Sequence, residues 1–438
     1  MSRAPRLFAC LALILLAASP LGAAEPSAPS PPLPPVAFSD PTYDFELRRG
    51  LGYALSGGAD LNEVLAAAHT IQPGDGDSWY QAWFALAERV RLTAETSLAL
   101  GRLVSAREAL LRASAYYRPA DFFLHANPRD PRILKAWRLS RDTFQRAAVL
   151  MERPVETVTI PYQDTTLPGY FLGPSASRQA RRTLIVQTGF DGTGEELYFE
   201  VAFFALARGY NVLIFEGPGQ GGVVREQGLF FRPDWEAVVT PVVDYALARP
   251  EVDPSRLALM GLSMGGYLVA RAAAHEHRLA ALVCNPGVMD MMAGRRPSAK
   301  QWQEMRADPS ATNKALRQRM AQDIGFRWLV NNGMFTMGVK TPLKFMEQFA
   351  RYRLTPQEAA KITANSLVIV SRGDHFMTYD EQKKLYEAMT CSKTLLEFTA
   401  AEDATPHCQM GAMAVSNQRV FDWLDQALDK KPCDCGAR

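Results

Sequence analysis

From residue 183 to residue 398 the chain alternates between short apolar segments and longer helical segments. The apolar segments are rich in Val, Ile and Leu, as strands buried on both faces are. They lie at 183–188, 210–215, 256–262, 279–284, 366–371 and 394–398, and helical patterns separate several of them near 195–208, 234–248, 264–276 and 380–389. Because such alternation produces parallel strands joined by helices, it predicts an α/β fold with a mostly parallel twisted sheet and helices on both faces.

The segments before these strands have a different pattern. Residues 25–42 are rich in proline and predict a linker, because proline fits neither a helix interior nor a central strand. Over 43–152, apolar residues such as Trp79, Trp83 and Leu86 recur at three- and four-residue spacing. This periodicity predicts an all-helical N-terminal domain.

A second domain is expected over 153–430, and it contains a helical insert at about 286–364. The insert is rich in methionine and aromatic residues, which either fill its own core or line a pocket. These residues are Met289, Met291, Met292, Trp302, Phe326, Trp328, Phe335, Phe345 and Phe349.

The first 24 residues have the three-part pattern of a secretory signal peptide. Arg3 and Arg6 precede an apolar run over 7–18, and Gly22-Ala23-Ala24 supplies small residues for cleavage. The alternative, a short membrane anchor, is disfavoured because about 12 apolar residues cannot span a bilayer. We therefore expect cleavage near Ala24 and export to the periplasm or the medium.

Charge and cysteine usage limit the classes of partner. With 48 basic and 46 acidic residues, the chain has a net charge of +2, which gives no reason to expect a nucleic-acid partner. No later segment is apolar for long enough to be an integral membrane span. Cys391 and Cys408 form one candidate disulfide, whereas Cys284 ends an apolar strand and is expected to be a buried thiol. The cysteine spacings do not resemble a zinc site, and no metal is expected.

The segment Gly261-Leu262-Ser263-Met264-Gly265-Gly266 follows one of the predicted strands and precedes a predicted helix. It matches G-x-S-x-G, in which glycines allow a sharp turn that exposes a serine hydroxyl. A serine hydroxyl is a weak nucleophile until a base takes its proton, and an acid must orient that base. Ser263 is therefore the candidate nucleophile, and it requires a histidine and a carboxylate.

Chain order selects the partners of Ser263. Asp374 and His407 each follow a predicted strand, in the order serine, acid, histidine that is typical of α/β-hydrolases. His375 is a competing candidate base, but its position directly after Asp374 makes a productive pairing between these two less natural. The sequence thus predicts a triad of Ser263, Asp374 and His407.

Two glycine-rich loops follow earlier strands. The backbone N–H groups of Met264 and of Phe190, in the loop 189–194, are the predicted oxyanion donors. The second loop, 217–222, matches G-x-G-x-x-G, but the absence of a helical period over 223–233 argues against a dinucleotide site. We interpret it as a loop near the rim of the active site and expect no cofactor.

Several motifs together resemble the α/β-hydrolase family of 2,6-dihydroxypseudooxynicotine hydrolase, which includes fungal polyketide-shortening hydrolases and the fermentation-respiration switch protein. The motifs are Phe190-Asp191-Gly192-Thr193, Gly217-Pro218-Gly219-Gln220-Gly221, Arg232-Pro233-Asp234-Trp235-Glu236, Gly261-Leu262-Ser263-Met264-Gly265-Gly266, His407-Cys408-Gln409 and, upstream, Ser105-Ala106-Arg107-Glu108. The resemblance covers about 75–425. It implies an α/β-hydrolase fold, an N-terminal helical cap and, often, cleavage of a carbon–carbon bond beside a ketone. It also implies an auxiliary acid after the sixth strand, for which Asp290 is the nearest match.

These features predict a metal-free serine hydrolase acting on an ester or an activated ketone of a mid-sized, apolar or aromatic small molecule. Acyl transfer or peptide hydrolysis by the same triad are alternatives. A non-catalytic binding protein is a further alternative that the intact triad disfavours. The choice between C–O and C–C cleavage stays open, as does the oligomeric state, for which a homodimer is one candidate.

Overall fold

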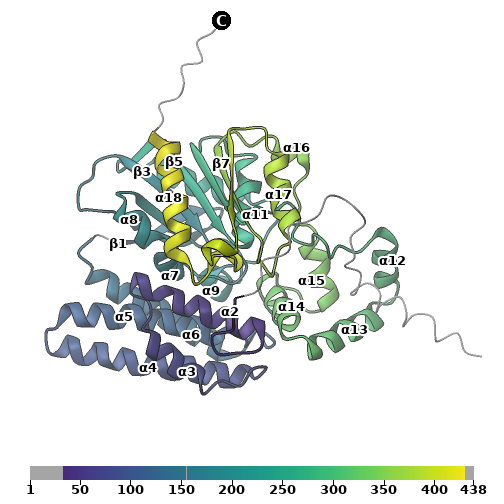
Figure 1. The fold of residues 1–438 in the computed structure, drawn as a ribbon, viewed down its shortest axis with the longest axis horizontal. Coiled ribbons are helices and arrows are strands. Elements are labelled where there is room, and N and C mark those ends of the chain that lie inside the picture. Colours follow the sequence, from purple (N-terminus) through teal and green to yellow (C-terminus); the bar gives the residue numbers. More distant parts are fainter. Residues whose placement is uncertain (1–32, 154, 430–438) are drawn as a thin grey trace, which may run out of the picture.

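A computed structural model describes residues 33–153 and 155–429 (Figure 1). The predicted signal peptide, most of the linker and the two C-terminal cysteines lie outside these ranges. Within them, no helix is both long and apolar enough to cross a membrane.

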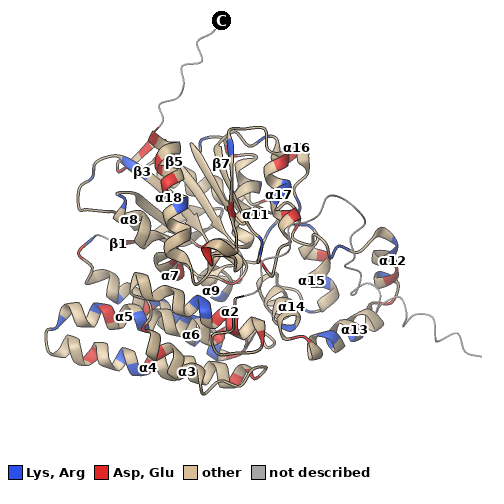
Figure 2. Cartoon of the chain, viewed as in Figure 1, with Lys and Arg blue, Asp and Glu red and all other residues tan. Residues whose placement is uncertain are grey.

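The N-terminal part of the described chain is helical. Its elements are α2 (Pro41–Gly52), η1 (Tyr53–Ser56), α3 (Leu61–Ala68), α4 (Gly76–Ala99), α5 (Leu103–Tyr117), η2 (Arg118–Asp121) and α6 (Pro131–Val149). Aspartates begin several of these helices, as at Asp40, whose carboxylate accepts hydrogen bonds from the backbone N–H groups of Thr42 and Tyr43. Trp79 and Trp83 are completely buried, so the predicted apolar spacing does form the packed side of α4. Figure 2 shows acidic and basic residues interspersed on these helices.

An eight-stranded sheet follows, with the order β1-β2-β4-β3-β5-β6-β7-β8. Its strands are β1 (Val155–Tyr162), β2 (Thr165–Leu172), β3 (Arg181–Gln187), β4 (Asn211–Phe215), β5 (Val252–Leu262), β6 (Ala281–Asn285), β7 (Asn365–Ser371) and β8 (Lys393–Phe398). The hairpin of β1 and β2 is antiparallel and joins β4 antiparallel, whereas the other neighbours are parallel. This topology confirms the predicted α/β class.

Helices cover both faces of the sheet, as alternate residues of the central strand show. Ala258 and Met260 of β5 pack into one core with the N-terminal helices and α18 (Met413–Asp429), whereas Leu257 and Leu259 pack into a second core with α10 (Glu236–Leu247) and α11 (Met264–Ala273). The remaining short helices are α7 (Gly194–Leu197), η3 (Tyr198–Ala202), α8 (Phe203–Ala207), α9 (Gly221–Glu226), α17 (Tyr379–Ala388), η4 (Ala400–Glu402) and η5 (His407–Gln409).

A helical insert lies between β6 and β7. It consists of α12 (Ala299–Ala307), α13 (Pro309–Gln322), α14 (Ile324–Thr336), α15 (Pro342–Phe349) and α16 (Pro356–Ala359). Figure 1 shows α12–α15 beside one end of the sheet and the N-terminal helices below it, with α2 between the two groups. Helix α14 also contacts α2. The insert and the N-terminal helices therefore meet near the carboxyl ends of the parallel strands, where α/β folds place their sites.

Candidate active site

Ser263 lies at the sharp turn between β5 and α11. Its backbone has φ 59° and ψ −128°, an unusual conformation for a residue with a side chain. The turn is tight because a Cβ atom on Gly261 would lie 2.1 Å from the carbonyl oxygen of Gly265. A Cβ atom on Gly265 would lie 2.7 Å from the carbonyl oxygen of Thr188. Both glycines of the motif are thus required by close backbone approach.

The side chains of Ser263, His407 and Asp374 are joined by hydrogen bonds. The distance from Ser263 Oγ to His407 Nε2 is 2.8 Å, and that from His407 Nδ1 to Asp374 Oδ2 is 2.7 Å. The other oxygen of Asp374 accepts hydrogen bonds from the backbone N–H groups of Phe376 and Met377. Since Asp374 follows β7 and His407 follows β8, adjacent parallel strands bring the acid and the base together at one edge of the sheet.

The environment sets the protonation preferences of these groups. Burial, the largest single effect, disfavours the imidazolium form of His407, but the Asp374 carboxylate and the neighbouring Cys408 together outweigh burial and hold the pKa of His407 well above its usual value. For Asp374, burial raises the pKa, but the His407 partner outweighs it and the net pKa is lowered. Asp374 therefore stays ionised and orients a strongly basic imidazole.

His375, the competing candidate base, has no hydrogen bond to Ser263 in the described part of the chain. Its ring packs against Phe45 at 4.5 Å and against Phe376 at 4.1 Å between centroids. Burial lowers the pKa of His375 to about 4, so its ring is neutral at physiological pH. The geometry thus favours His407 as the base.

The loop after β3 lies directly against the nucleophile. A Cβ atom on Gly189 would lie 2.7 Å from Ser263 Cβ and 2.8 Å from the backbone nitrogen of Met264. The next residue is Phe190, whose carbonyl oxygen accepts a hydrogen bond of 3.0 Å from Asn332 Nδ2 of α14. The loop that contains Phe190 therefore meets the Ser263 turn, and Phe190 and Met264, the two predicted oxyanion donors, both line the pocket with Ser263. Sequence reasoning missed Asn332, which lies 142 residues from the loop that it holds.

The second glycine-rich loop supports the first one. Gln220 Nε2 donates hydrogen bonds to the carbonyl oxygens of Thr188 at 2.7 Å and Gly189 at 3.1 Å. One premise of the sequence interpretation is wrong, because the short helix α9 does follow this loop. The Glu216 carboxylate accepts a hydrogen bond from the backbone N–H of Gly222 in the first turn of α9. A side chain of the protein thus occupies the position that a phosphate takes in a dinucleotide site.

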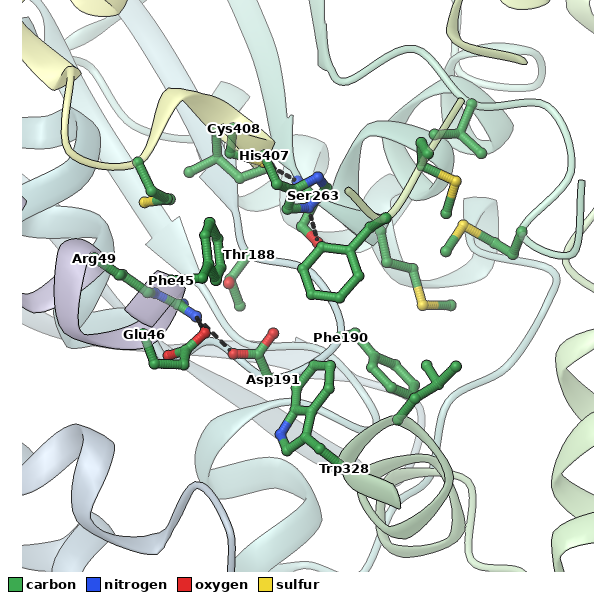
Figure 3. A pocket seen from close by; sticks show the side chains of 18 of the residues that line it. Phe45, Glu46, Arg49, Thr188, Phe190, Asp191, Ser263, Trp328, His407 and Cys408 are labelled. Atoms are coloured by element: carbon green, nitrogen blue, oxygen red, sulfur yellow. Dashed lines mark hydrogen bonds and ion pairs between the residues drawn. The ribbon is translucent and has the colours of Figure 1, made fainter. Parts of the chain in front are cut away.

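A pocket opens beside Ser263 and His407, and the empty space in it, together with the open solvent at its mouth, amounts to about 860 Å³ (Figure 3). Its walls are mostly apolar and come from three regions of the chain. The insert contributes Met291, Trp328 and Phe349, and α2 contributes Phe45. Only part of the methionine- and aromatic-rich insert lines the pocket, since Phe345 and most of its other apolar residues pack in the cores.

The expectation for Asp290 is wrong. Asp290 does not line the pocket, although the neighbouring Val288 and Met291 do. The Asp290 carboxylate instead accepts hydrogen bonds of 2.6 and 2.7 Å from Arg296 and one of 2.9 Å from the backbone N–H of Met292. Because the local chain folds back on itself here, the carboxylate is engaged in a turn and an ion pair outside the pocket.

The candidate disulfide is also wrong in this structure, where Cys391 and Cys408 are free thiols. Cys391 Sγ lies 3.6 Å from Ser366 Oγ, whereas Cys408 lies in the active site. The backbone N–H of Ser263 donates to Cys408 Sγ at 3.0 Å and to the carbonyl oxygen of Asn285 at 2.7 Å. Cys408 thus helps to hold the nucleophile turn, a role that the sequence did not reveal. Cys284 is buried, as predicted.

A buried cluster of charged side chains borders the pocket on the side of the N-terminal helices. We call it the interdomain cluster, and it consists of Glu46, Arg49, Tyr53, Arg118, Asp191, Glu196 and Glu200. Arg49 Nη1 and Arg118 Nη2 both contact Asp191 Oδ2, at 2.7 and 2.8 Å. Both arginines also pair with Glu196, at 3.0 and 2.6 Å. Its ion pairs join α2 and η2 to the loop after β3 and to the helices that follow.

The carboxyl groups of the interdomain cluster differ in protonation. Burial, the largest effect on each, raises the pKa of Glu46 to about 7 and that of Glu200 to about 8. For Asp191, the two arginines outweigh burial and lower the pKa to about 2. Asp191 is therefore the permanently ionised acid that borders the pocket. No group of three or more His, Cys, Asp or Glu side chains in the described ranges could hold a metal ion.

Comparisons with known proteins agree with this fold. Residues 179–401 match the family model of serine aminopeptidase, S33. The chain is 33% identical to hydrolase LUC6 of Fusarium sp and 34% identical to 20-hydroxy-prefusarin hydrolase FUS2 of Gibberella moniliformis, each over 409 residues, covering 89% of this chain and 97% of the relative. The crystal structure of 2,6-dihydroxy-pseudo-oxynicotine hydrolase matches with a TM-score of 0.68 at 21% identity, over 86% of this chain and 95% of that one. These matches confirm the predicted family resemblance.

Proposed function

Since this chain belongs to the serine aminopeptidase S33 family of α/β-hydrolases, we propose that it is a serine hydrolase whose nucleophile, base and orienting acid are Ser263, His407 and Asp374. The observation that carries this proposal is the 2.8 Å contact between Ser263 Oγ and His407 Nε2 at the wall of a large apolar pocket. The pocket supports a mid-sized, apolar or aromatic small molecule as substrate.

The geometry supports acyl transfer through a covalent intermediate. His407 Nε2 accepts the Ser263 hydroxyl proton while Oγ bonds to the substrate carbonyl carbon. The negative charge that develops on the carbonyl oxygen is stabilised by the N–H groups of Met264 and Phe190. His407 then protonates the leaving group, and the acyl–Ser263 ester remains. A water molecule that loses its proton to His407 hydrolyses this ester and regenerates the serine, while Asp374 stays ionised.

The bond that is broken is an ester C–O bond or a C–C bond beside a ketone. In the second case, the leaving group is an enolate, and the His407 imidazolium returns the proton to its carbon. The chain's likeness to 20-hydroxy-prefusarin hydrolase and 2,6-dihydroxy-pseudo-oxynicotine hydrolase supports an organic small molecule as the substrate, and this is part of the proposal. The N-terminal helices over 43–152 act as a cap on the site, because Phe45 and Arg49 of α2 border the pocket.

Two measurements test the proposal. A fluorophosphonate probe should label the wild-type protein and fail to label Ser263→Ala, and equal labelling of the two would show that Ser263 is not the nucleophile. The purified protein should then be assayed side by side with aryl esters and with β-diketones that are matched in size. Cleavage of the esters alone would exclude the C–C reaction, and products analysed with a competing alcohol present would reveal acyl transfer.

Export is a further part of the proposal. It is supported by the signal-peptide pattern over 1–24, which lies outside the described residues. Protein recovered from the periplasm or the medium of expressing cells should begin at Glu25. Full-length protein confined to the cytoplasm would contradict export without affecting the proposed chemistry.

A further inference from the structure

Asp191 places a charged carboxylate in the wall of the mostly apolar pocket that Ser263 also lines, where the other charged side chains are Glu46, Arg49, Glu200 and Arg295. It follows the oxyanion residue Phe190 in the chain, and both residues line the pocket together with Ser263. Both arginines that hold Asp191 contact the same oxygen, Oδ2. Among the described residues, no donor contacts Oδ1. Figure 3 shows this second oxygen directed toward the space on the Ser263 side of the pocket.

The surroundings of Asp191 make it a rigid acceptor. Arg49 and Arg118 are buried, and each has a further carboxylate partner in Glu196 that fixes its guanidinium. The Asp191 side chain is 11% exposed and is one of the residues that line the pocket. A carboxylate with one oxygen fixed and the other directed into a cavity can accept a hydrogen bond from a ligand with little rearrangement.

The surroundings also limit the kind of donor. The charge of Asp191 is already balanced by two guanidinium groups, so a substrate cation is not needed to neutralise it. A cation would also lose its hydration against the apolar walls formed by Phe190, Trp328 and their neighbours. A hydroxyl group costs less to bury and supplies a proton that the unpartnered Oδ1 can accept in a hydrogen bond.

We infer that Asp191 selects hydroxylated substrates by accepting a hydrogen bond from a hydroxyl group on the part of the substrate that occupies the pocket beside Ser263. This inference rests on the proposed function and adds the class of substrate to it. Asp191 acts as a specificity residue in this scheme, because the bond-breaking steps proceed through Ser263 and His407. When the substrate lacks the hydroxyl, Asp191 Oδ1 stays charged, partly desolvated and without a partner. Both the binding of that substrate and the stabilisation of its transition state are then weaker.

The test uses 1-naphthyl acetate and its isomers with a hydroxyl at position 5, 6 or 7, each compared with the matching methoxy compound. A methoxy group keeps the size but cannot donate a hydrogen bond. Values of kcat/KM are divided by the alkaline hydrolysis rate of each ester to remove intrinsic reactivity. At least one hydroxyl isomer should exceed its methoxy counterpart about tenfold or more, as expected for a hydrogen bond to a charged group. Equal values throughout the series would overturn the inference.

Two variants locate the effect. Asp191→Asn keeps the shape and removes the charge, and the hydroxyl-to-methoxy ratio should fall to about threefold or less. Asp290→Asn is the matched control, because Asp290 is also an arginine-paired aspartate but lies outside the pocket. Its ratio should equal that of the wild type. An unchanged ratio in Asp191→Asn, or an equal fall in Asp290→Asn, would overturn the inference.

The failure of this inference can be distinguished from failure of the proposed function. Labelling of Ser263 by the fluorophosphonate probe and cleavage of unsubstituted 1-naphthyl acetate report the triad alone. If both are present, the hydroxyl-to-methoxy comparison on the wild-type protein decides the role of Asp191, even where a variant folds poorly. If Ser263 is not labelled, the proposed function itself is wrong.

Discussion

Replacing Asp374 with asparagine probes the catalytic arrangement most directly. The substitution keeps the shape of the side chain, and its amide oxygen can still accept hydrogen bonds from the backbone N–H groups of Phe376 and Met377. The amide NH₂ group then takes the place of Oδ2, which lies 2.7 Å from His407 Nδ1. Because an NH₂ group donates, Nδ1 must become an acceptor, and the proton moves to Nε2. His407 then donates to Ser263 Oγ and can no longer take its proton.

The expected loss is large. In a triad, replacing the carboxylate by an amide lowers kcat about 10⁴-fold, which corresponds to roughly 5.5 kcal/mol of transition-state stabilisation. The pH profile should change as well. In the wild type, kcat/KM requires neutral His407, so it rises with pH through a pKa that Asp374 holds well above the usual histidine value. Without that charge, burial dominates, and the residual activity should rise at lower pH.

The assay is a stopped-flow measurement of 4-nitrophenolate release from a short-chain ester between pH 5 and 10. His375→Gln is a suitable control, because His375 is adjacent to Asp374 but has no bond to Ser263 in the described part of the chain. It should retain kcat within about tenfold of the wild type. The reasoning is refuted if Asp374→Asn retains more than about a tenth of wild-type kcat, or if His375→Gln loses as much as Asp374→Asn.

Three further predictions concern the support of the site. Gly189→Ala should lower kcat about 100-fold or more, measured with the same ester, because its Cβ would collide with Ser263 and displace an oxyanion donor. Asn332→Ala should lower kcat about tenfold with a smaller change in KM, since it frees the Phe190 carbonyl; an unchanged kcat would contradict this role. Glu200 has an unfolded pKa near 4.5 and a folded pKa of about 8, so the folded state binds the extra proton and stability falls as pH rises between these values. In thermal melts, the Tm of Glu200→Gln should therefore fall less between pH 6 and pH 9 than the Tm of the wild type. An equal fall in Tm would show that Glu200 does not cause this pH dependence of stability.

The parts of the site that could be predicted from the sequence are those that follow strand ends. Ser263 follows β5 directly, and Asp374 and His407 lie in the loops after β7 and β8. A parallel sheet brings such loops to one edge. Chain order was therefore enough to select residues that the structure joins by hydrogen bonds. Asp290, which only the family resemblance suggested, also follows a strand, but its carboxylate forms a local ion pair with Arg296 six residues later. Position after a strand does not specify the direction of a side chain.

The interdomain cluster could not be predicted, because its partners are far apart in the chain. Arg49 lies 142 residues before Asp191, and Arg118 lies 73 residues before it. On helices, both arginines are indistinguishable in pattern from solvated surface residues.

The cluster also explains how the N-terminal helices affect the site. Since Asp191 is the next residue after Phe190, the ion pairs from α2 and η2 hold the same segment that supplies the proposed oxyanion donor. The N-terminal helices are therefore a wall of the pocket and also brace the loop that packs against Ser263 through Gly189, so a change in their packing is expected to alter the proposed catalytic geometry.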